Sequence, residues 1–330
     1  MTALLEVERL TVRLLVEGEP RPVLQEVDLQ IAAGEAVGLV GESGSGKSMT
    51  ARAIARLLPP KAGVEGSMCF GGRDVMSLRG AELREYRGEV AMIFQDPRAH
   101  VNPVRRIGDF MTEALRTNRG VAAAQARRRA VSLLEDVGID DGERRLGQYP
   151  HELSGGMLQR VMIAAALLTE PRLILADEPT TALDVTIQAE VMAILDALRR
   201  DLGLALLFIT HDLDLAAAVC DRTTVMYAGQ IVEMQPSQLL HDDPLHPYTS
   251  GLIAARPSVS QTAPRLQAIP GRPLSAFEAP AGCAFTSRCP HAQERCTAGR
   301  PPLRGLGGGL VRCVRAEELR GMLATTAAHG

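Results

Sequence analysis

The sequence predicts an α/β fold that carries a helical insertion and ends in a small, loop-rich region. Strand and helix patterns alternate through residues 172–234, which is typical of a parallel sheet joined by crossover helices. Residues 104–169 instead follow a helical period. After about residue 235, prolines interrupt the chain repeatedly and four of the six cysteines follow. We therefore expect a main domain at 1–235, with a helical subdomain at about 96–169, and a C-terminal region at 236–330.

Alternating and continuous apolar runs predict the elements near the N-terminus. Residues 5–14 and 23–31 alternate apolar and polar positions, which favours two antiparallel strands joined by a turn at 17–20. The continuous apolar run 36–40 predicts a buried strand, followed by a helix at 46–58. Further strands are expected at 64–78 and 89–94.

Composition and charge narrow the functional classes. Hydrophobic residues make up 46% of the chain and charged residues 23%, as in ordinary soluble proteins. The net charge of −3 provides no basic footprint, so no nucleic-acid partner is expected. The apolar runs are too short to span a bilayer, and the first residues lack the basic and apolar regions of a signal peptide. We therefore expect a cytosolic protein whose membrane role would come through a partner.

A glycine-rich loop stands between the buried strand and the helix that follows it. The pattern Gly41-x-x-x-x-Gly46-Lys47-Ser48 lets the backbone approach phosphates closely, with its N–H groups pointing inward. Lys47 is expected to reach the β- and γ-phosphates, and the Ser48 hydroxyl to bind Mg²⁺. The predicted nucleotide loop comprises Gly41, Glu42, Ser43, Gly44, Ser45, Gly46, Lys47, Ser48 and Met49.

Two adjacent acids end the apolar strand predicted at 173–177. Asp177 is expected to hold the Mg²⁺ shell, and Glu178 to act as general base on the attacking water. Gln95 follows an apolar segment and can supply a neutral oxygen to the metal. His211 closes the strand predicted at 205–210, where it can contact the γ-phosphate and orient the water.

A second phosphate-binding loop, Ser154-Gly155-Gly156, opens a predicted helix. One chain has little use for two such loops on a single nucleotide, whereas two chains that face each other do. The pattern therefore predicts an ATPase that works as a head-to-tail pair.

Together these motifs resemble those of the ATP-binding-cassette (ABC) ATPases over at least residues 4–240. The resemblance implies a P-loop NTPase (RecA-like) core with an antiparallel β subdomain, and ATP and Mg²⁺ as cofactors. It implies that Ser154, Gly155 and Gly156 bind the γ-phosphate of the nucleotide held by the partner subunit. The resemblance assigns Walker A to 41–48, the Q-loop to Gln95, the signature loop to 153–159, Walker B to 173–177, the D-loop with Asp184 to 182–184, and the H-loop to His211.

Several short sequence segments resemble those of the ATPases of dipeptide, oligopeptide and nickel importers, and among these ATPases those of the D-type subunit. The segments lie at 93–97, 102–103, 154–157, 182–188 and 226–229, and in the tail at 246–249 and 282–290. The resemblance implies a second homologous ATPase subunit, two transmembrane permeases and an extracytoplasmic substrate-binding protein as partners. It places the chain at the cytoplasmic face of the membrane.

Two departures from that family stand out. Leu14 occupies the position where an aromatic side chain usually stacks on adenine, so ring stacking would be lost there. Residues 98–101 differ from the sequence common in peptide importers and are slightly more similar to the nickel branch. The C-terminal region with its cysteines is instead more similar to peptide importers. The substrate class, peptide or nickel, stays open.

Four cysteines near the C-terminus, Cys283, Cys289, Cys296 and Cys313, form the remaining candidate site. Cytosolic disulfides are disfavoured, and the spacing is not the paired CxxC of a zinc ribbon. Four thiolates can hold a [4Fe–4S] cluster or Zn²⁺, and some members of the resembled family carry an iron–sulfur cluster at the matching cysteines. Cluster, zinc and free thiols are the three alternatives, with a structural role favoured over electron transfer. Cys69 and Cys220 are expected to be core residues.

Two other functions compete with the importer ATPase. A soluble ABC ATPase of translation or DNA repair usually has two cassettes or long coiled-coil insertions, and neither is predicted here. A degenerate subunit that binds ATP but hydrolyses it poorly is disfavoured by the presence of Lys47, Asp177, Glu178 and His211.

Overall fold

The structure is a computed structural model that describes residues 3–180, 185–255 and 268–323. The chain divides into two compact units. The first contains residues 1–5, 31–35 and 69–209, and the second contains residues 6–30, 36–68 and 210–330.

Three parallel strands form the sheet of the first unit, in the order β6 (Val90–Ile93), β7 (Leu173–Asp177) and β8 (Ala205–Thr210). Every residue of β7 and β8 is buried, as expected for parallel strands covered on both faces. Ile93 pairs with Ala176, and Asp177 pairs with Ile209. The carboxyl ends of these strands therefore share one edge, where the predicted acids leave the sheet.

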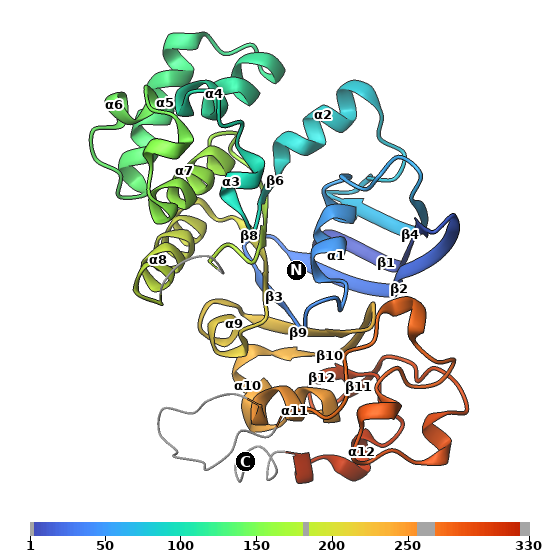
Figure 1. The fold of residues 1–330 in the computed structure, drawn as a ribbon. Coiled ribbons are helices and arrows are strands. Elements are labelled where there is room, and N and C mark those ends of the chain that lie inside the picture. The colour runs from blue at the N-terminus through green and yellow to red at the C-terminus, as the bar shows by residue number, and fades with distance from the viewer. Residues whose placement is uncertain (1–2, 181–184, 256–267, 324–330) are drawn as a thin grey trace. The chain divides into compact units, whose positions relative to one another are not determined.

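Helices make up most of the rest of the first unit (Figure 1). The helical pattern of residues 104–169 is confirmed: this segment forms four successive helices, and Met111, Leu115 and Leu134 are among their buried side chains. Helix α2 was not predicted because its sequence has no apolar stripe and buries only Tyr86. The helices are α2 (Gly80–Glu89), α3 (Pro97–His100), α4 (Ile107–Asn118), α5 (Ala123–Asp136), α6 (Gly142–Leu146), α7 (Gly155–Leu167) and α8 (Val185–Leu202), with a 3₁₀ turn at Pro150–Glu152.

The second unit contains the strand that precedes the glycine-rich loop. Its sheet has the order β11 (Arg304–Leu306), β12 (Gly309–Val311), β10 (Gln230–Pro236), β9 (Arg222–Tyr227) and β3 (Ala36–Val40). Only β3 and β9 are parallel; the other neighbours are antiparallel. The prediction of crossover connections throughout 172–234 was wrong at its end, because Ala228 and Gly229 both have positive φ and close a tight hairpin between β9 and β10.

The N-terminal elements agree with the sequence pattern, except that one strand and one helix are shorter than expected. Strands β1 (Ala3–Val16) and β2 (Glu19–Ala32) are present, and the order in the second unit is β2, β1, β4. The strand expected at 64–78 is shorter: β4 (Gly63–Phe70) turns back antiparallel into β5 (Arg73–Asp74). Helix α1 (Lys47–Ile54) ends before residue 58, because Arg56 adopts a left-handed φ of 57°.

The region after residue 235 shares a core with β3 and β9, which the sequence patterns did not predict. Tyr227, Tyr248 and Phe285 are all buried in one cluster, with ring centroids 4.7 to 5.3 Å apart. Strand β12 also pairs with β10. The helices of this unit are α9 (Leu213–Val219), α10 (Ser237–Asp242), α11 (Pro247–Ala254) and α12 (Ala316–Leu319), with 3₁₀ turns at Ala276–Glu278, Thr286–Arg288 and Glu294–Cys296.

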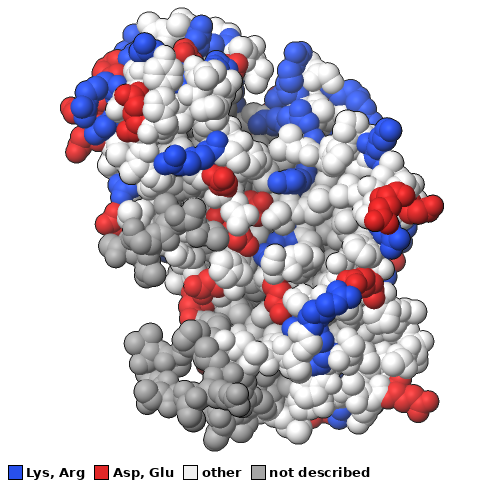
Figure 2. Space-filling view, viewed as in Figure 1, with Lys and Arg blue, Asp and Glu red and all other residues white. Residues whose placement is uncertain are grey.

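The distribution of surface charge and the hydropathy of the helices agree with the small net charge and the short apolar runs of the sequence. Figure 2 shows acidic and basic side chains interspersed over the displayed face, without a continuous stripe of one sign. Within the described ranges, no helix has both the length and the apolar character needed for a membrane span.

Candidate nucleotide-binding site

The glycine-rich loop, residues 41–48, connects β3 to α1 in the second unit. Its first and last glycines, Gly41 and Gly46, lie too close to neighbouring atoms for any larger residue. A Cβ atom at Gly41 would lie 2.2 Å from the carbonyl oxygen of Met226. A Cβ atom at Gly46 would lie 2.9 Å from Leu24 Cδ2, and the Gly46 φ of 111° is one that other residues rarely adopt. The loop therefore has the tight strand-to-helix geometry expected of a phosphate cradle.

The loop contains a buried ammonium group and a buried hydroxyl. Lys47 is 5% exposed, and its Nζ donates hydrogen bonds to the carbonyl oxygens of Gly41 (2.8 Å) and Glu42 (3.0 Å). Ser45 is 3% exposed, and its Oγ has no hydrogen-bond partner among the described residues. Buried hydroxyls normally have a partner, so a bound phosphate oxygen would complete this loop.

Ser48 and Met49 lie in the first turn of α1 and are half-buried. The N–H groups of a helix's first turn have no partner within the helix, and they favour an anion at that end. The whole predicted nucleotide loop, from Gly41 to Met49, thus lies in the second unit.

In the first unit, Asp177 is the last residue of β7 and Glu178 follows it. Asp177 is 4% exposed, and Glu178 is half-buried. Glu178 has a φ of 44°, in the left-handed region that such a residue seldom adopts, and its N–H donates to the carbonyl oxygen of Ile209 at 3.0 Å. Backbone strain of this kind persists where the surrounding structure enforces it, and it often marks a functional position.

Gln95 follows β6 and is exposed. Its Nε2 donates a hydrogen bond of 3.0 Å to Glu178 Oε2. The two residues are 83 positions apart in the sequence, and the parallel pairing of β6 with β7 brings their strand ends to the same edge. The structure therefore places together two residues that the sequence predicted for catalysis.

His211 directly follows β8, is exposed, and belongs to the second unit. Gln95, Asp177 and Glu178 belong to the first unit. Asp184, the residue predicted to belong to the D-loop, lies outside the described residues.

The Ser154-Gly155-Gly156 loop opens α7 in the first unit, as the sequence predicted. Ser154 is the N-cap, and its Oγ accepts a hydrogen bond from the Met157 N–H at 3.3 Å. A Cβ atom at Gly156 would lie 2.8 Å from Ile187 Cγ2, so this turn packs closely on α8. Ser154 is exposed and Gly155 half-buried, so the N-terminus of α7 is accessible to an anion.

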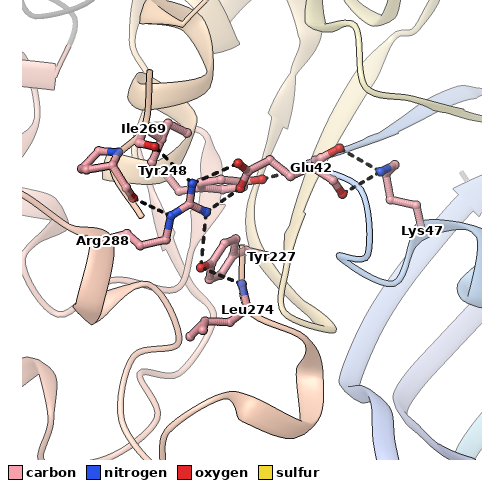
Figure 3. Close-up of polar contacts among 9 residues, drawn as sticks. Glu42, Lys47, Tyr227, Tyr248, Ile269, Leu274 and Arg288 are labelled. Atoms are coloured by element: carbon pink, nitrogen blue, oxygen red, sulfur yellow. Dashed lines mark hydrogen bonds and ion pairs between the residues drawn. The ribbon is translucent and has the colours of Figure 1, made fainter. Parts of the chain in front are cut away.

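Sequence reasoning missed the residues that hold Glu42. The Arg288 guanidinium makes a two-pronged ion pair with the Glu42 carboxylate, and the Tyr248 hydroxyl accepts a hydrogen bond from the Glu42 N–H at 2.9 Å (Figure 3). Both partners come from the C-terminal region, 246 and 206 positions away. No periodicity or motif spacing connects such distant segments, so the sequence offered no signal for this contact.

The four C-terminal cysteines line one cavity of about 20 Å³. Burial, with a smaller contribution from the neighbouring cysteines, raises the pKa of Cys289 and Cys313 to about 11. In the described part of the chain, no group of three or more His, Cys, Asp or Glu side chains is arranged so that it could hold a metal ion. Cys220 is buried in the core as predicted, whereas Cys69 is only half-buried.

Comparisons with known proteins agree on one family. Residues 24–181 match the ABC transporter family model, and residues 232–296 match the oligopeptide/dipeptide transporter C-terminal region. The chain is 43% identical to the oligopeptide transport ATP-binding protein OppD of Salmonella typhimurium, over 94% of this chain and 92% of the relative. It is 42% identical to OppD of Escherichia coli, over the same shares of the two chains.

Among solved structures, the chain is similar to the ATP-binding cassette MJ0796 in a dimeric, post-hydrolysis state bound to ADP and Pi. The TM-score is 0.63 and the sequence identity 29%, and the match covers 71% of this chain and 98% of MJ0796.

Proposed function

Because the chain belongs to the ATP-hydrolysing subunits of ABC transporters, we propose that it energises the import of peptides. The observation that carries this proposal is the presence on one chain of both matched regions, the ABC transporter region and the oligopeptide/dipeptide transporter C-terminal region. The relatives described above are named for oligopeptide transport and match 94% of this chain. The C-terminal match favours transport over the alternative of a soluble ABC ATPase in translation or DNA repair.

In this proposal, the glycine-rich loop binds the phosphates of ATP. The Lys47 ammonium turns from the loop carbonyls toward the β- and γ-phosphates, while the inward N–H groups surround them. Ser48, Gln95 and Asp177 offer hydroxyl, amide and carboxylate oxygens, the kind of ligand that Mg²⁺ prefers. Mg²⁺, when bound, would supply positive charge that neutralises the phosphates.

Hydrolysis then needs a base for the attacking water. Glu178 accepts the water proton, and the Gln95 hydrogen bond holds the Glu178 carboxylate in one orientation. His211 orients the same water near the γ-phosphate. Asp177 ends β7 and Glu178 follows it, and the two acids have different roles. The buried Asp177 serves the metal, and the half-buried Glu178 serves the water.

The second phosphate-binding loop implies a partner. Ser154, Gly155 and Gly156, with Asp184, contact the ATP of a second, homologous ATPase subunit, so that two chains close on two nucleotides. The dimeric state of MJ0796 with ADP and Pi supports this arrangement. The remaining partners in the proposal are two membrane permeases and an extracytoplasmic substrate-binding protein, with this chain on the cytoplasmic face. The proposal divides the chain at residue 235 into an ATPase domain and a C-terminal region.

The uptake of peptides tests the function directly. In a strain that lacks this chain, ATP-dependent uptake of labelled di- and oligopeptides should be lost and should return with the wild-type chain. Radioactive Ni²⁺ provides the second arm, because the nickel branch of the family remains the alternative substrate class. Normal peptide uptake without the chain, or loss of Ni²⁺ uptake alone, would contradict a peptide importer.

We also propose that the four C-terminal thiols hold a [4Fe–4S] cluster. Each cysteine of such a cluster binds a different iron, so the thiols need to surround a cavity rather than converge on one ion. Cys283, Cys289, Cys296 and Cys313 line one cavity, where burial raises the pKa of the Cys289 and Cys313 thiols to about 11. The group's role would be to cross-link the C-terminal region.

An anaerobic visible spectrum with elemental analysis of the full chain tests this assignment. Iron at about four atoms per chain with thiolate-to-iron absorbance is expected. Stoichiometric zinc without iron would replace the cluster by Zn²⁺, and the absence of both metals would leave free thiols.

A further inference from the structure

Arg288 joins the C-terminal region to the glycine-rich loop. It ends the 3₁₀ turn Thr286–Arg288, and its side chain is only 3% exposed. Its Nη1 donates to Glu42 Oε2 at 2.6 Å, and its Nη2 donates to Glu42 Oε1 at 3.0 Å. Two parallel bonds to a guanidinium fix both the position and the plane of the carboxylate.

The guanidinium is also held from its other side. Arg288 Nε donates to the carbonyl oxygen of Pro270 at 2.9 Å, and Nη1 donates to the Tyr227 hydroxyl at 3.5 Å (Figure 3). Because its planar donors are engaged in several directions, the side chain is restrained by contacts other than Glu42. Arg288 therefore provides a fixed support for the loop.

Glu42 is held at three points. Its carboxylate is bound by Arg288, its N–H donates to the buried Tyr248 hydroxyl, and its carbonyl oxygen accepts a hydrogen bond from Lys47 Nζ. Two separate segments of the C-terminal region, α11 and the 286–288 turn, thus act on one residue of the loop. That residue's carbonyl contacts the ammonium that serves the phosphates.

We propose that Arg288 is a positioning residue for the nucleotide site, acting through Glu42 to hold the backbone of the glycine-rich loop in the conformation that binds ATP. The inference rests on the proposed function only in that this loop binds ATP. According to this proposal, the C-terminal region raises the affinity of the same chain for ATP. This effect does not depend on whether the four cysteines bind a metal.

A different role would be purely structural, with the ion pair serving only to anchor the C-terminal region. The two roles predict different measurements. Loss of an anchor lowers stability and leaves the affinity of the folded protein for ATP unchanged. Loss of a positioning residue lowers that affinity even where the fold is intact, because a misplaced loop presents its N–H groups and ammonium in the wrong place.

The experiment compares Arg288→Ala, Glu42→Gln and the double variant of the full-length chain, with MgATP affinity measured by calorimetry and folding by thermal melting. Glu42→Gln leaves the Arg288 bonds to Pro270 and Tyr227 in place, so it removes the ion pair without disturbing the contacts of Arg288 inside the C-terminal region. The matched control is Arg272→Ala. Arg272 lies in the same region and makes the same two-pronged pair with Glu278, but its side chain is 70% exposed.

We expect each single variant to weaken MgATP binding by about 10- to 100-fold. The double variant should be no weaker than Arg288→Ala, because both changes remove one interaction. Arg288→Lys should lie between wild type and Arg288→Ala, since it keeps the charge without the fork. In the assembled complex, Arg288→Ala should raise the KM for ATP, while kcat at saturating ATP should stay within about twofold.

Wild-type affinity in folded Arg288→Ala and Glu42→Gln, or effects that simply add in the double variant, would overturn the inference. The same holds if Arg272→Ala weakens binding as much as Arg288→Ala. A wild-type chain that does not bind MgATP would instead overturn the proposed function.

Discussion

The side-chain amide of Gln95 donates a 3.0 Å hydrogen bond to the carboxylate of Glu178, from the end of one parallel strand to the end of the next. The bond links an exposed residue to a half-buried one whose backbone is strained at φ 44°. The orientation of the predicted base is therefore fixed by two independent means, a side-chain donor and an enforced backbone conformation.

Glu178→Gln should abolish turnover and leave ATP binding intact. The glutamine keeps the size of the side chain and can still accept the bond from Gln95, but it cannot take a proton from water. We expect steady-state ATP hydrolysis by the assembled complex to fall at least about 100-fold, with MgATP affinity unchanged. Glu143→Gln, a change at an exposed ion pair of the same unit, is the control and should keep full turnover. Full turnover in Glu178→Gln would exclude the assigned role.

Ser154→Asp should impair the nucleotide bound to the partner subunit. Aspartate retains the N-cap hydrogen bond to the Met157 N–H, so α7 should stay folded. Its negative charge repels a γ-phosphate, and azido-ATP photolabelling of the wild-type partner in the mixed complex should fall about tenfold. Labelling of the variant chain itself should persist. Loss of labelling on the variant chain alone would contradict the division of labour between the two loops.

The protein should become less stable as pH rises from about 5 to about 8, because Glu233 loses its proton in the folded state over this range. Burial raises the pKa of this carboxyl from 4.5 to about 7, although bonds from Thr249, Leu245 and His246 oppose the shift. The folded state then binds more protons than the unfolded state in this window, so the free energy of unfolding falls with pH, by about 3 kcal/mol in all.

Glu233→Gln removes this titration. Denaturant unfolding followed from pH 5 to pH 8 should show a shallower decline in the variant than in the wild type. The variant should also be less stable at pH 5, because an amide nitrogen cannot accept a bond from a backbone N–H. Parallel pH profiles for the two proteins would assign the pH dependence to other groups.

The cavity thiols should react slowly when the protein contains no metal. The pKa values of Cys289 and Cys313 are raised to about 11, so little thiolate exists at pH 7.5. Iodoacetamide labelling, followed by peptide mass spectrometry, should accelerate at these two positions as pH approaches 10 while the protein remains folded. The urea-unfolded chain serves as the control and should react readily at pH 8. Fast labelling of the folded, metal-free protein at pH 7.5 would contradict the burial of these thiols.

Local patterns predicted the parts of the molecule whose geometry is local. The buried run 36–40, the glycine-rich loop and the helix after it are neighbours in sequence, and the structure has them as β3, the loop and α1. Ser154 was predicted to open a helix, and it caps α7. Asp177 was predicted to end an apolar strand, and β7 ends there. In each case a few consecutive residues determine the result.

Contacts between distant segments were not predicted. Strands β11 and β12 have only three residues each, too few to show an alternating pattern, and they exist because β10 offers an edge to pair with. Helix α2 buries only Tyr86 and therefore lacks an apolar stripe. The ion pair between Glu42 and Arg288 has no local cause either, since the fold alone brings these positions together.

That ion pair also sets an order of events during synthesis. Glu42 leaves the ribosome long before its partner, because 246 residues separate it from Arg288. At typical elongation rates, the nascent chain waits about 12 to 50 s between the two. During that interval the glycine-rich loop exists without the side chain that braces it. The glycine-rich loop of a newly made chain therefore gains this contact only after the C-terminal region has been synthesised.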